Sequence, residues 1–247
     1  MRLKTLKRAC VPLHLPISWL FWIQAAPMEQ WSWLVLVVRK LPWLTTGRAL
    51  ASKKNRAIAL SHGRWVLSLD ADEKVTPELK AEIIAALQAP TADVYAIGRL
   101  SKYCGQYMHH SGWYPDPVTR LFCRGSAHFT DDLVHEKLMT KKSVGKLSGL
   151  ILHESFKDFE SVLEKINRYS SAGAEMAILK GKKSSVTKAV TRGVWAFFRT
   201  YILRLGFLDG QMGLVLAISN GEGTYYRYLK IWLSQNNLKK SGRHHED

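Results

Sequence analysis

Residues 65–73 read Trp-Val-Leu-Ser-Leu-Asp-Ala-Asp-Glu, and this stretch decides the fold class. Its first five residues are mostly apolar strand formers, which favours a short buried β-strand. Three carboxylates follow directly, at Asp70, Asp72 and Glu73. In open α/β sheets, ligands bind outside the carboxyl ends of the strands. The stretch therefore predicts an α/β protein with a functional site where this strand ends.

Asp70 and Asp72 form the candidate metal pair. One small residue separates them, so both carboxylates can serve one divalent cation, directly or through water. Carboxylate oxygens suit Mg²⁺ or Mn²⁺, and these cations in turn hold diphosphates. The alternative is a strand followed by an acidic turn, because Asp favours turns.

The flanking segments predict helices on both sides of the strand. Thr76-Pro77-Glu78 is typical of a helix start, with an N-cap, a proline at the first position and an acid in the first turn. An apolar stripe at helical spacing then continues to Gln88. Upstream, the basic residues 53–56 precede a short apolar helix over 57–60. This arrangement fits a polyanion held between the cation and the basic cluster.

The segment 53–79, KKNRAIALSHGRWVLSLDADEKVTPEL, resembles family 2 glycosyltransferases, which are inverting enzymes of GT-A fold that use nucleotide sugars. Five further motifs resemble one subgroup, the lipopolysaccharide core glycosyltransferases, including the inner-core β-1,4-glucosyltransferases. These motifs are GWYPD at 112–116, RLF at 120–122, VHEKL at 134–138, LHESF at 152–156 and KINRYS at 165–170. The resemblance extends from about residue 53 to about residue 232.

The resemblance implies a role for each motif on the donor side. Asp72 is expected to bind the metal directly, while Asp70 binds it indirectly or binds the ribose. Lys54, Asn55 and Arg56 correspond to nucleotide-side residues of the family; otherwise they are a solvated helix start. The expected cofactor is Mg²⁺ or Mn²⁺.

On the acceptor side, inversion requires a carboxylate that takes the proton of the acceptor hydroxyl. Glu136 occupies the position of the family's base motif, and Asp131 and Asp132 are its rivals. We expect His153 to have a structural or orienting role. The resemblance implies that the acceptor is contacted by Trp113, Asp116, Arg120 and His135. A core aromatic is the alternative for the tryptophan.

The first 52 residues do not match the family. Family members open with a βα unit that ends in a DSGSTDGT-like loop for the nucleotide, and this chain contains no such string. Codons for residues 22–34, read one frame over, can spell LDSGSTDGTVEL. We therefore hypothesise that a frameshift altered the N-terminal segment and that this chain is impaired. A divergent N-terminus is the alternative, and the coding DNA decides between the two.

Composition and net charge limit the classes of binding partner that the chain can have. The net charge of the 247 residues is +16, which calls for an anionic partner such as nucleic acid, acidic lipid or a phosphorylated substrate. No zinc-ligand spacing, helix-turn-helix or RNP-like strand supports nucleic acid, so we expect none. The three cysteines form no CxxC motif and indicate reduced thiols in a cytosolic setting.

The C-terminal third is basic and amphipathic. Seven lysines and arginines and no acidic residue lie between Glu175 and Asp209. Apolar residues over 190–208 recur at helical spacing, which suits the surface of an anionic membrane or, alternatively, packing on the catalytic domain. The N-terminal apolar stretch is interrupted by polar residues and is a poor transmembrane span. We predict three segments, residues 1–52, 53–175 and 176–247, the last a helical membrane-associating region.

These observations predict a fold and a function. The fold class is α/β, a GT-A-type mixed sheet flanked by helices, with the N-terminal βα unit missing. The function is transfer of a hexose, glucose from UDP-glucose, to a lipid-linked lipopolysaccharide core acceptor, peripherally at the cytoplasmic face of the inner membrane. The alternatives are a polyprenyl-phosphate or capsule acceptor, or an inactive remnant that only binds membrane.

Overall fold

A computed structural model of the chain describes residues 33–38, 54–55, 58–59, 63–70, 72–130 and 137–243, and it describes side chains from residue 54 to residue 236 of these ranges. Its main sheet has the strand order β1-β2-β6-β4-β9-β3, and β5 pairs antiparallel with the end of β4. The strands are β1 (Trp33–Val38), β2 (Trp65–Asp70), β3 (Glu73–Val75), β4 (Val94–Tyr103), β5 (Gln106–Tyr107), β6 (Pro117–Cys123) and β9 (Val144–Phe156). β7 (Ala127–Phe129) and β8 (Leu138–Thr140) form a separate antiparallel pair.

The sheet is mixed, as predicted. β1 runs parallel to β2 and β4 runs parallel to β9, whereas β6 is antiparallel to both β2 and β4. We expected no strand from the N-terminal segment, but β1 lies there and pairs with β2 along its whole length, so that Val38 lies opposite Asp70. β1 therefore covers the edge of the sheet beside β2.

α2 (Pro77–Gln88) confirms the helix predicted after the acidic stretch. Thr76 caps it by accepting a hydrogen bond from the Leu79 amide. Its apolar stripe packs on one face of the sheet. Gly149 of β9 permits the close approach, because a Cβ there would lie 2.5 Å from Cα of Leu79. Glu82 accepts from the backbone amides of Ser148 and Gly149, which fixes α2 on the sheet.

The predicted strand over β2 is also confirmed, and both of its faces are buried. Trp65, Leu67 and Leu69 pack with α2 in one core cluster. Val66 points to the other face and packs with Phe122, Phe129 and their neighbours. A strand buried on both faces reads as a continuous apolar run, which explains the pattern in the sequence.

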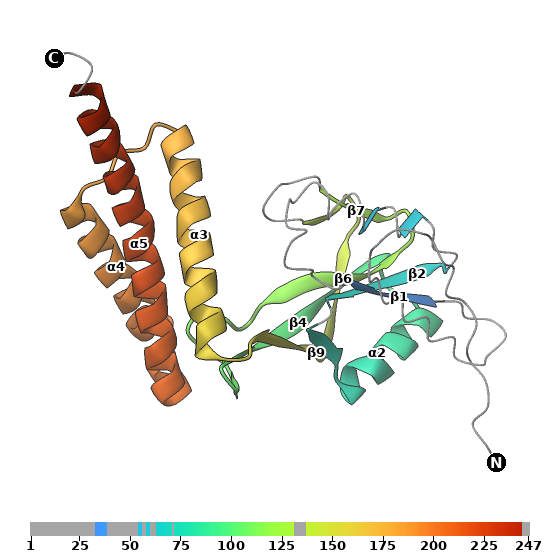
Figure 1. Cartoon of the computed structure of the whole chain (residues 1–247). Helices are drawn as coiled ribbons and strands as arrows, with labels where there is room; N and C mark the ends of the chain where they lie inside the picture. Colours follow the sequence, from blue (N-terminus) through green and yellow to red (C-terminus); the bar gives the residue numbers. More distant parts are fainter. Residues whose placement is uncertain are drawn as a thin grey trace, which may run out of the picture.

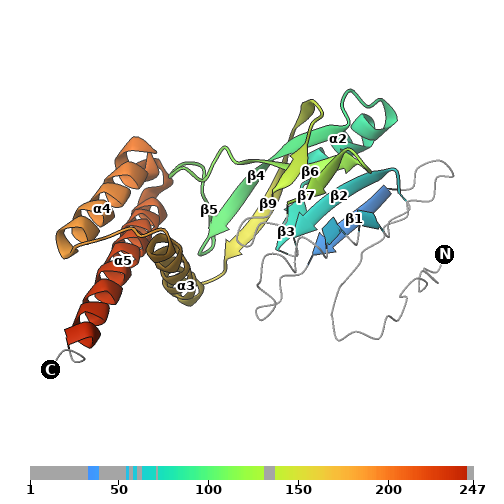
Figure 2. The ribbon, with the colours of Figure 1, turned by 90° about the horizontal axis from the view of Figure 1, so that it is seen from above.

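The C-terminal part is a helical bundle beside the sheet (Figures 1 and 2). It contains α3 (Phe159–Leu179), α4 (Val186–Phe198), the π-helical turn η1 (Arg199–Leu203), the 3-10 turn η2 (Gly206–Asp209) and α5 (Gly210–Arg243). α3 continues past residue 175, where we expected the catalytic segment to end. In both views α4 lies on the side of the bundle away from the sheet.

In the described part of the chain, no single helix is long and apolar enough to cross a membrane. One pair of helical stretches, 186–203 and 206–236, passes that test only in combination, and the two are bent by 71° relative to each other.

Candidate active site

The acidic end of β2 brings three carboxylates together, and they differ in exposure. The side chain of Glu73 is fully buried, that of Asp70 is 13% exposed and that of Asp72 is 43% exposed. β3 pairs antiparallel with β9, and this register sets Glu73 opposite His153. The turn between β2 and β3 therefore leaves Asp72 as the most accessible of the three carboxylates.

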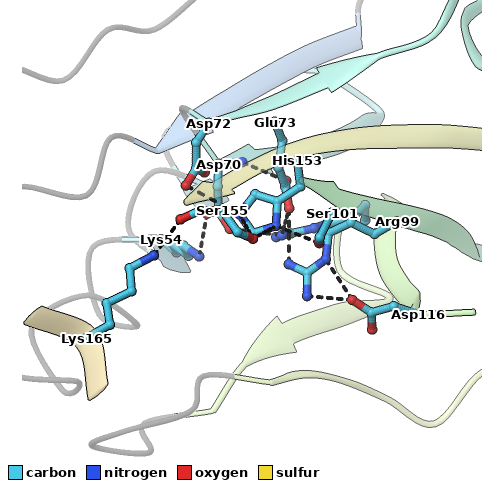
Figure 3. A network of polar contacts seen from close by, with 11 residues as sticks. Lys54, Asp70, Asp72, Glu73, Arg99, Ser101, Asp116, His153, Ser155 and Lys165 are labelled. Carbon is cyan, nitrogen blue, oxygen red and sulfur yellow. Dashed lines mark hydrogen bonds and ion pairs between the residues drawn. The ribbon is translucent and has the colours of Figure 1, made fainter. Parts of the chain in front are cut away.

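Arg99 and Arg120 neutralise the buried carboxylates, and Figure 3 labels Arg99 among them. An Nη atom of Arg120 lies 2.9 Å from Oδ2 of Asp70 and also donates to Oε1 of Glu73. Arg99 lies 3.3 Å from the same Glu73 oxygen and binds Asp116 at 2.7 and 2.9 Å. Burial lowers the pKa of Arg120, but the charges of Asp70 and Glu73 outweigh it and raise that pKa overall. The network fixes the Asp70 carboxylate in position.

This network changes the interpretation of Arg120 and Asp116, which we predicted as acceptor contacts. Arg120 is 8% exposed and lies beneath the acidic turn, between two carboxylates. Asp116 is partly exposed, and its carboxylate binds Arg99. The structure therefore gives Arg120 a positioning role and attaches Asp116 to the same network. Glu73 and Arg99, which the sequence analysis did not select, are central to it.

Lys54, one of the predicted nucleotide-side residues, lies beside Asp70. Nζ of Lys54 is 3.5 Å from Oδ1 of Asp70 and 4.9 Å from the ring centre of Phe129. Asn55 donates to the carbonyl of Phe129 and accepts from its amide, both at 2.9 Å. Asn55 thus attaches its segment to β7, while Lys54 adds a second cation beside Asp70. Arg56 lies outside the described residues.

Asp72 faces an imidazole. Nε2 of His153 lies 3.4 Å from Oδ2 of Asp72, and Nδ1 lies 3.0 Å from Oγ of Ser101 and 2.8 Å from Oγ of Ser155. Burial raises the pKa of Asp72, but the hydrogen bond and charge of His153 outweigh it, and the pKa lies below its usual value. The two serine hydroxyls orient the ring so that Nε2 points at Asp72 (Figure 3).

Asp72 and His153 offer one oxygen and one nitrogen ligand for a divalent cation, but these two side chains do not complete its coordination. Asp72 and His153 present an ionised carboxylate and an imidazole nitrogen side by side. Asp70 is adjacent, but Arg120 and Lys54 occupy its oxygens. Among the described residues, no group of three or more carboxylate, imidazole or thiol side chains is arranged to hold a metal. Oxygens of a diphosphate and of water would have to complete the coordination.

An aromatic cavity lies beside this site. Trp113 packs against Tyr103 and Phe156, with ring centres 5.6 and 5.8 Å apart. These three rings line a cavity of about 290 Å³ between the sheet and the helices α3 and α5. Lys165 lines it too, and it donates to the carbonyl of Ser155, next to His153. Trp113 is thus at a cavity wall, as an acceptor contact requires, and it also packs in the core.

The predicted base and its rivals lie outside the described residues. The segment 131–136 contains Asp131, Asp132, His135 and Glu136. Its described flanks, Thr130 and Lys137, are hydrogen-bonded to each other and continue β7 and β8. β7 is also the strand that Asn55 binds. The roles of the four residues stay predictions.

Comparison with known proteins identifies the class. Residues 40–147 match the family model "Glycosyl transferase family 2". This part of the chain therefore matches a family 2 glycosyltransferase domain, which confirms the resemblance seen in the sequence and supports a transferase. The match begins at residue 40, within the segment that we expected not to fit.

Named relatives agree with this class. An uncharacterized glycosyltransferase of Rickettsia prowazekii, RP128, is 29% identical over 202 residues, which cover 77% of this chain and 68% of that protein. The lipopolysaccharide core biosynthesis glycosyltransferase LpsC of Rhizobium meliloti is 25% identical and covers 76% and 72%. A crystal structure of S. aureus TarS 1-349 is 14% identical with a TM-score of 0.29, and the match covers 74% of this chain and 63% of that one.

Proposed function

We propose that this protein transfers glucose, with inversion, from UDP-glucose to a lipopolysaccharide core acceptor at the cytoplasmic face of the inner membrane. The observation that carries the proposal is the Asp70–Asp72–His153 arrangement at the end of β2, within a family 2 glycosyltransferase domain. The relative LpsC, named for lipopolysaccharide core biosynthesis, supports the choice of acceptor.

In this proposal Asp72 and His153 hold Mg²⁺ or Mn²⁺ directly, and Asp70 contributes through water or binds the ribose. A cation held by these residues would supply positive charge for the leaving diphosphate. Arg120 holds Asp70 in position, and Lys54 offers a second positive charge beside it. Ser101 and Ser155 keep the His153 ring in the required orientation.

The acceptor hydroxyl gives its proton to a carboxylate as it attacks the anomeric carbon. We assign this base to Glu136, with Asp132 as the rival, and we assign His135 to the acceptor side. The aromatic cavity beside His153 is our choice for the acceptor sugar, because aromatic faces pack on sugar rings and its polar side chains can hydrogen-bond hydroxyls. Lys165, at the cavity wall, is placed to meet an acidic acceptor group.

The membrane location rests on the outer surface of the bundle. Large apolar side chains are exposed along α4, η1 and η2, among them Val194 at 63% and Leu203 at 57%. The same stretch carries basic residues and no acidic ones between residues 176 and 208. Apolar exposure combined with positive charge matches an anionic bilayer. A second copy of the chain fits less well, because it would bring the same positive charge.

The test is transfer in vitro. The purified chain, and a version whose residues 1–52 follow the shifted reading frame, would be incubated with Mn²⁺, UDP-glucose and a truncated lipopolysaccharide core. We expect a product heavier by one hexose, with a β linkage by NMR, that chelation of the metal prevents. UDP-galactose and polyprenyl phosphate serve as alternative donor and acceptor. Preferred use of either one would reject the assigned donor or acceptor while leaving the transferase class intact.

A further inference from the structure

A basic pocket lies between α3, α4 and α5, toward the end of the bundle where α3 connects to α4. Its volume is about 330 Å³. The cationic side chains that line it are Lys182, Lys183, Lys188, Arg192 and Arg227, and no acidic residue lines it. Ala177, Tyr228 and Ile231 complete its lining. Ala177 and Ile231 are buried, so the pocket has an apolar base beneath cationic walls.

The walls of the basic pocket are held by contacts with backbone. Gln235 of α5 donates to the carbonyl of Lys182 at 3.0 Å and accepts from the Ser184 amide, so the α3–α4 connection is attached to α5. Nζ of Lys188 donates to the carbonyl of Lys183 at 3.1 Å, and Nε of Arg227 donates to the carbonyl of Gly173 at 3.2 Å. Two of the five cations are therefore positioned before any ligand arrives.

The charge of the basic pocket is not balanced within the described part of the protein. The ion pairs found there involve none of the five cations, and each is bordered by others of the same sign. Like charges at close range repel one another, and an anion bound among them would remove that repulsion. A phosphate group offers several acceptor oxygens to several cations at once, which suits this set of donors.

The surroundings favour a lipid as the source of the phosphate. Lys188 and Arg192 lie one turn apart on α4, and the same helix exposes Val190, Val194 and Trp195 to solvent. An interfacial helix places apolar side chains at the acyl boundary and cations at the level of the phosphates. Because α4 lies on the side of the bundle away from the sheet, nothing in the described part of the chain covers this surface (Figures 1 and 2).

We propose that the basic pocket binds the phosphate of an anionic lipid headgroup, with the exposed apolar side chains of α4 in contact with the same bilayer. This inference rests on the proposed membrane location and deepens it. It supplies a specific phosphate site where the location alone requires only general attraction between charges.

The test measures vesicle binding of the full chain, without donor or acceptor, so that its result is separate from transferase activity. Vesicles of phosphatidylcholine alone and of phosphatidylcholine with phosphatidylglycerol are compared by flotation. The variant K188Q/R192Q removes two pocket charges. The matched control K141Q/K142Q removes two exposed charges from the β8–β9 connection, and circular dichroism checks that both variants fold.

We expect the chain to bind the anionic vesicles and K188Q/R192Q to bind them roughly twenty-five-fold more weakly, since each basic residue near the surface contributes about a fivefold factor. The control should change binding less than about twofold. Equal losses in both double variants would overturn the site in favour of diffuse attraction. Equal binding of the unmodified chain to both kinds of vesicle would overturn the lipid source and leave a soluble phosphate as the ligand.

Discussion

At the scale of single residues, the carboxylates at the end of β2 have separate tasks. Glu73 is buried against Arg99 and Arg120, and Asp70 shares Arg120 with it. Asp72 is the most exposed of the three, and its ion-pair partner is a histidine that can itself bind metal. Removal of Glu73 or Asp70 would leave a buried arginine with less compensation, whereas removal of Asp72 would leave no buried charge behind.

Replacing Asp72 with Ala is therefore expected to abolish Mn²⁺-dependent transfer and leave the fold intact. Transfer with UDP-glucose and the thermal unfolding midpoint are measured together. Glu154→Gln is the control, because Glu154 directly follows His153 on β9 and its side chain pairs with the exposed Lys74. Normal manganese-dependent activity in the Asp72 variant would reject the metal assignment.

Replacing Glu136 with Gln tests the proposed base. We expect donor binding to stay nearly unchanged and turnover to fall by roughly a hundredfold or more, the usual scale for a general base. Asp131→Asn and Asp132→Asn serve as matched comparisons in the same segment. If either of these is inactive while Glu136→Gln is not, then the base is one of the rival aspartates.

The sequence predicted part of this site for a physical reason. An apolar run followed by acids predicts which carboxylates end a buried strand, because that signal is local. The pairing of Glu73 with Arg99 and Arg120 joins residues that are distant in the chain, and it depends on the strand order β2-β6-β4. Likewise, His153 meets Asp72 only because β3 pairs with β9. Such register is set by the assembled sheet and is not encoded in a local motif.

At the scale of elements, the helix-start residues 76–78 and the apolar stripe that follows them predicted α2. The close packing of the helical bundle depends instead on particular small residues, which no such local signal reveals. Gly193 of α4 faces α5, and a Cβ there would lie 3.0 Å from Cβ of Tyr225 and 3.1 Å from the carbonyl oxygen of Gly221. The amphipathic pattern over 190–208 predicted one helix. The structure breaks it at Leu205, whose backbone is left-handed. A hydrophobic pattern does not reveal where a chain turns.

Gly193→Val should separate α4 from α5 and lower the free energy of unfolding by about 1–3 kcal/mol, the usual cost of overpacking. Urea unfolding followed by circular dichroism measures this loss. Gly223→Val, at a helical glycine of α5 where an added Cβ would make only an ordinary contact of 3.7 Å, controls for the effect of a β-branched residue on helix propensity. Equal stability of the two variants would show that α4 and α5 do not pack through this glycine.

Asp209 attaches the bundle to the sheet domain and offers a second test at this scale. Its buried carboxylate accepts from the amides of His109 and His110 and from the hydroxyl of Ser111, at 2.9–3.0 Å. These residues directly precede Trp113, which lines the aromatic cavity.

Asp209→Asn should weaken these bonds and lower the free energy of unfolding by about 1–3 kcal/mol, because a buried donor would lose its acceptor. Urea unfolding measures the change, and amide hydrogen exchange at 109–111 should accelerate. Asp93→Asn, at an exposed carboxylate with a long pair to Lys142, should change little. Unchanged exchange at 109–111 would contradict this role for Asp209.

At the scale of the whole molecule, the question is how well the sheet can hold a nucleotide. β1 covers the edge of the sheet beside β2 and ends opposite Asp70, so the acidic turn has a strand on that side. What residues 1–52 lack is the DSGSTDGT-like loop that the family resemblance implies for the nucleotide. Lys54 and the acidic turn can hold a metal and part of a diphosphate, but they offer few hydrogen bonds to a base and ribose.

The chain should therefore bind UDP-glucose weakly. Each missing hydrogen bond reduces the binding free energy by about 0.5–1.5 kcal/mol, so the loss of three reduces the affinity for UDP-glucose by roughly a hundredfold. Isothermal titration with Mn²⁺ would compare the chain with the version whose residues 1–52 follow the shifted frame, and Asp72→Ala in each controls for metal-dependent binding. We expect saturable binding from the shifted version alone. Tight binding by the chain itself, lost in its Asp72→Ala variant, would mean that its own N-terminal segment completes the nucleotide site, and the frameshift hypothesis would then be wrong.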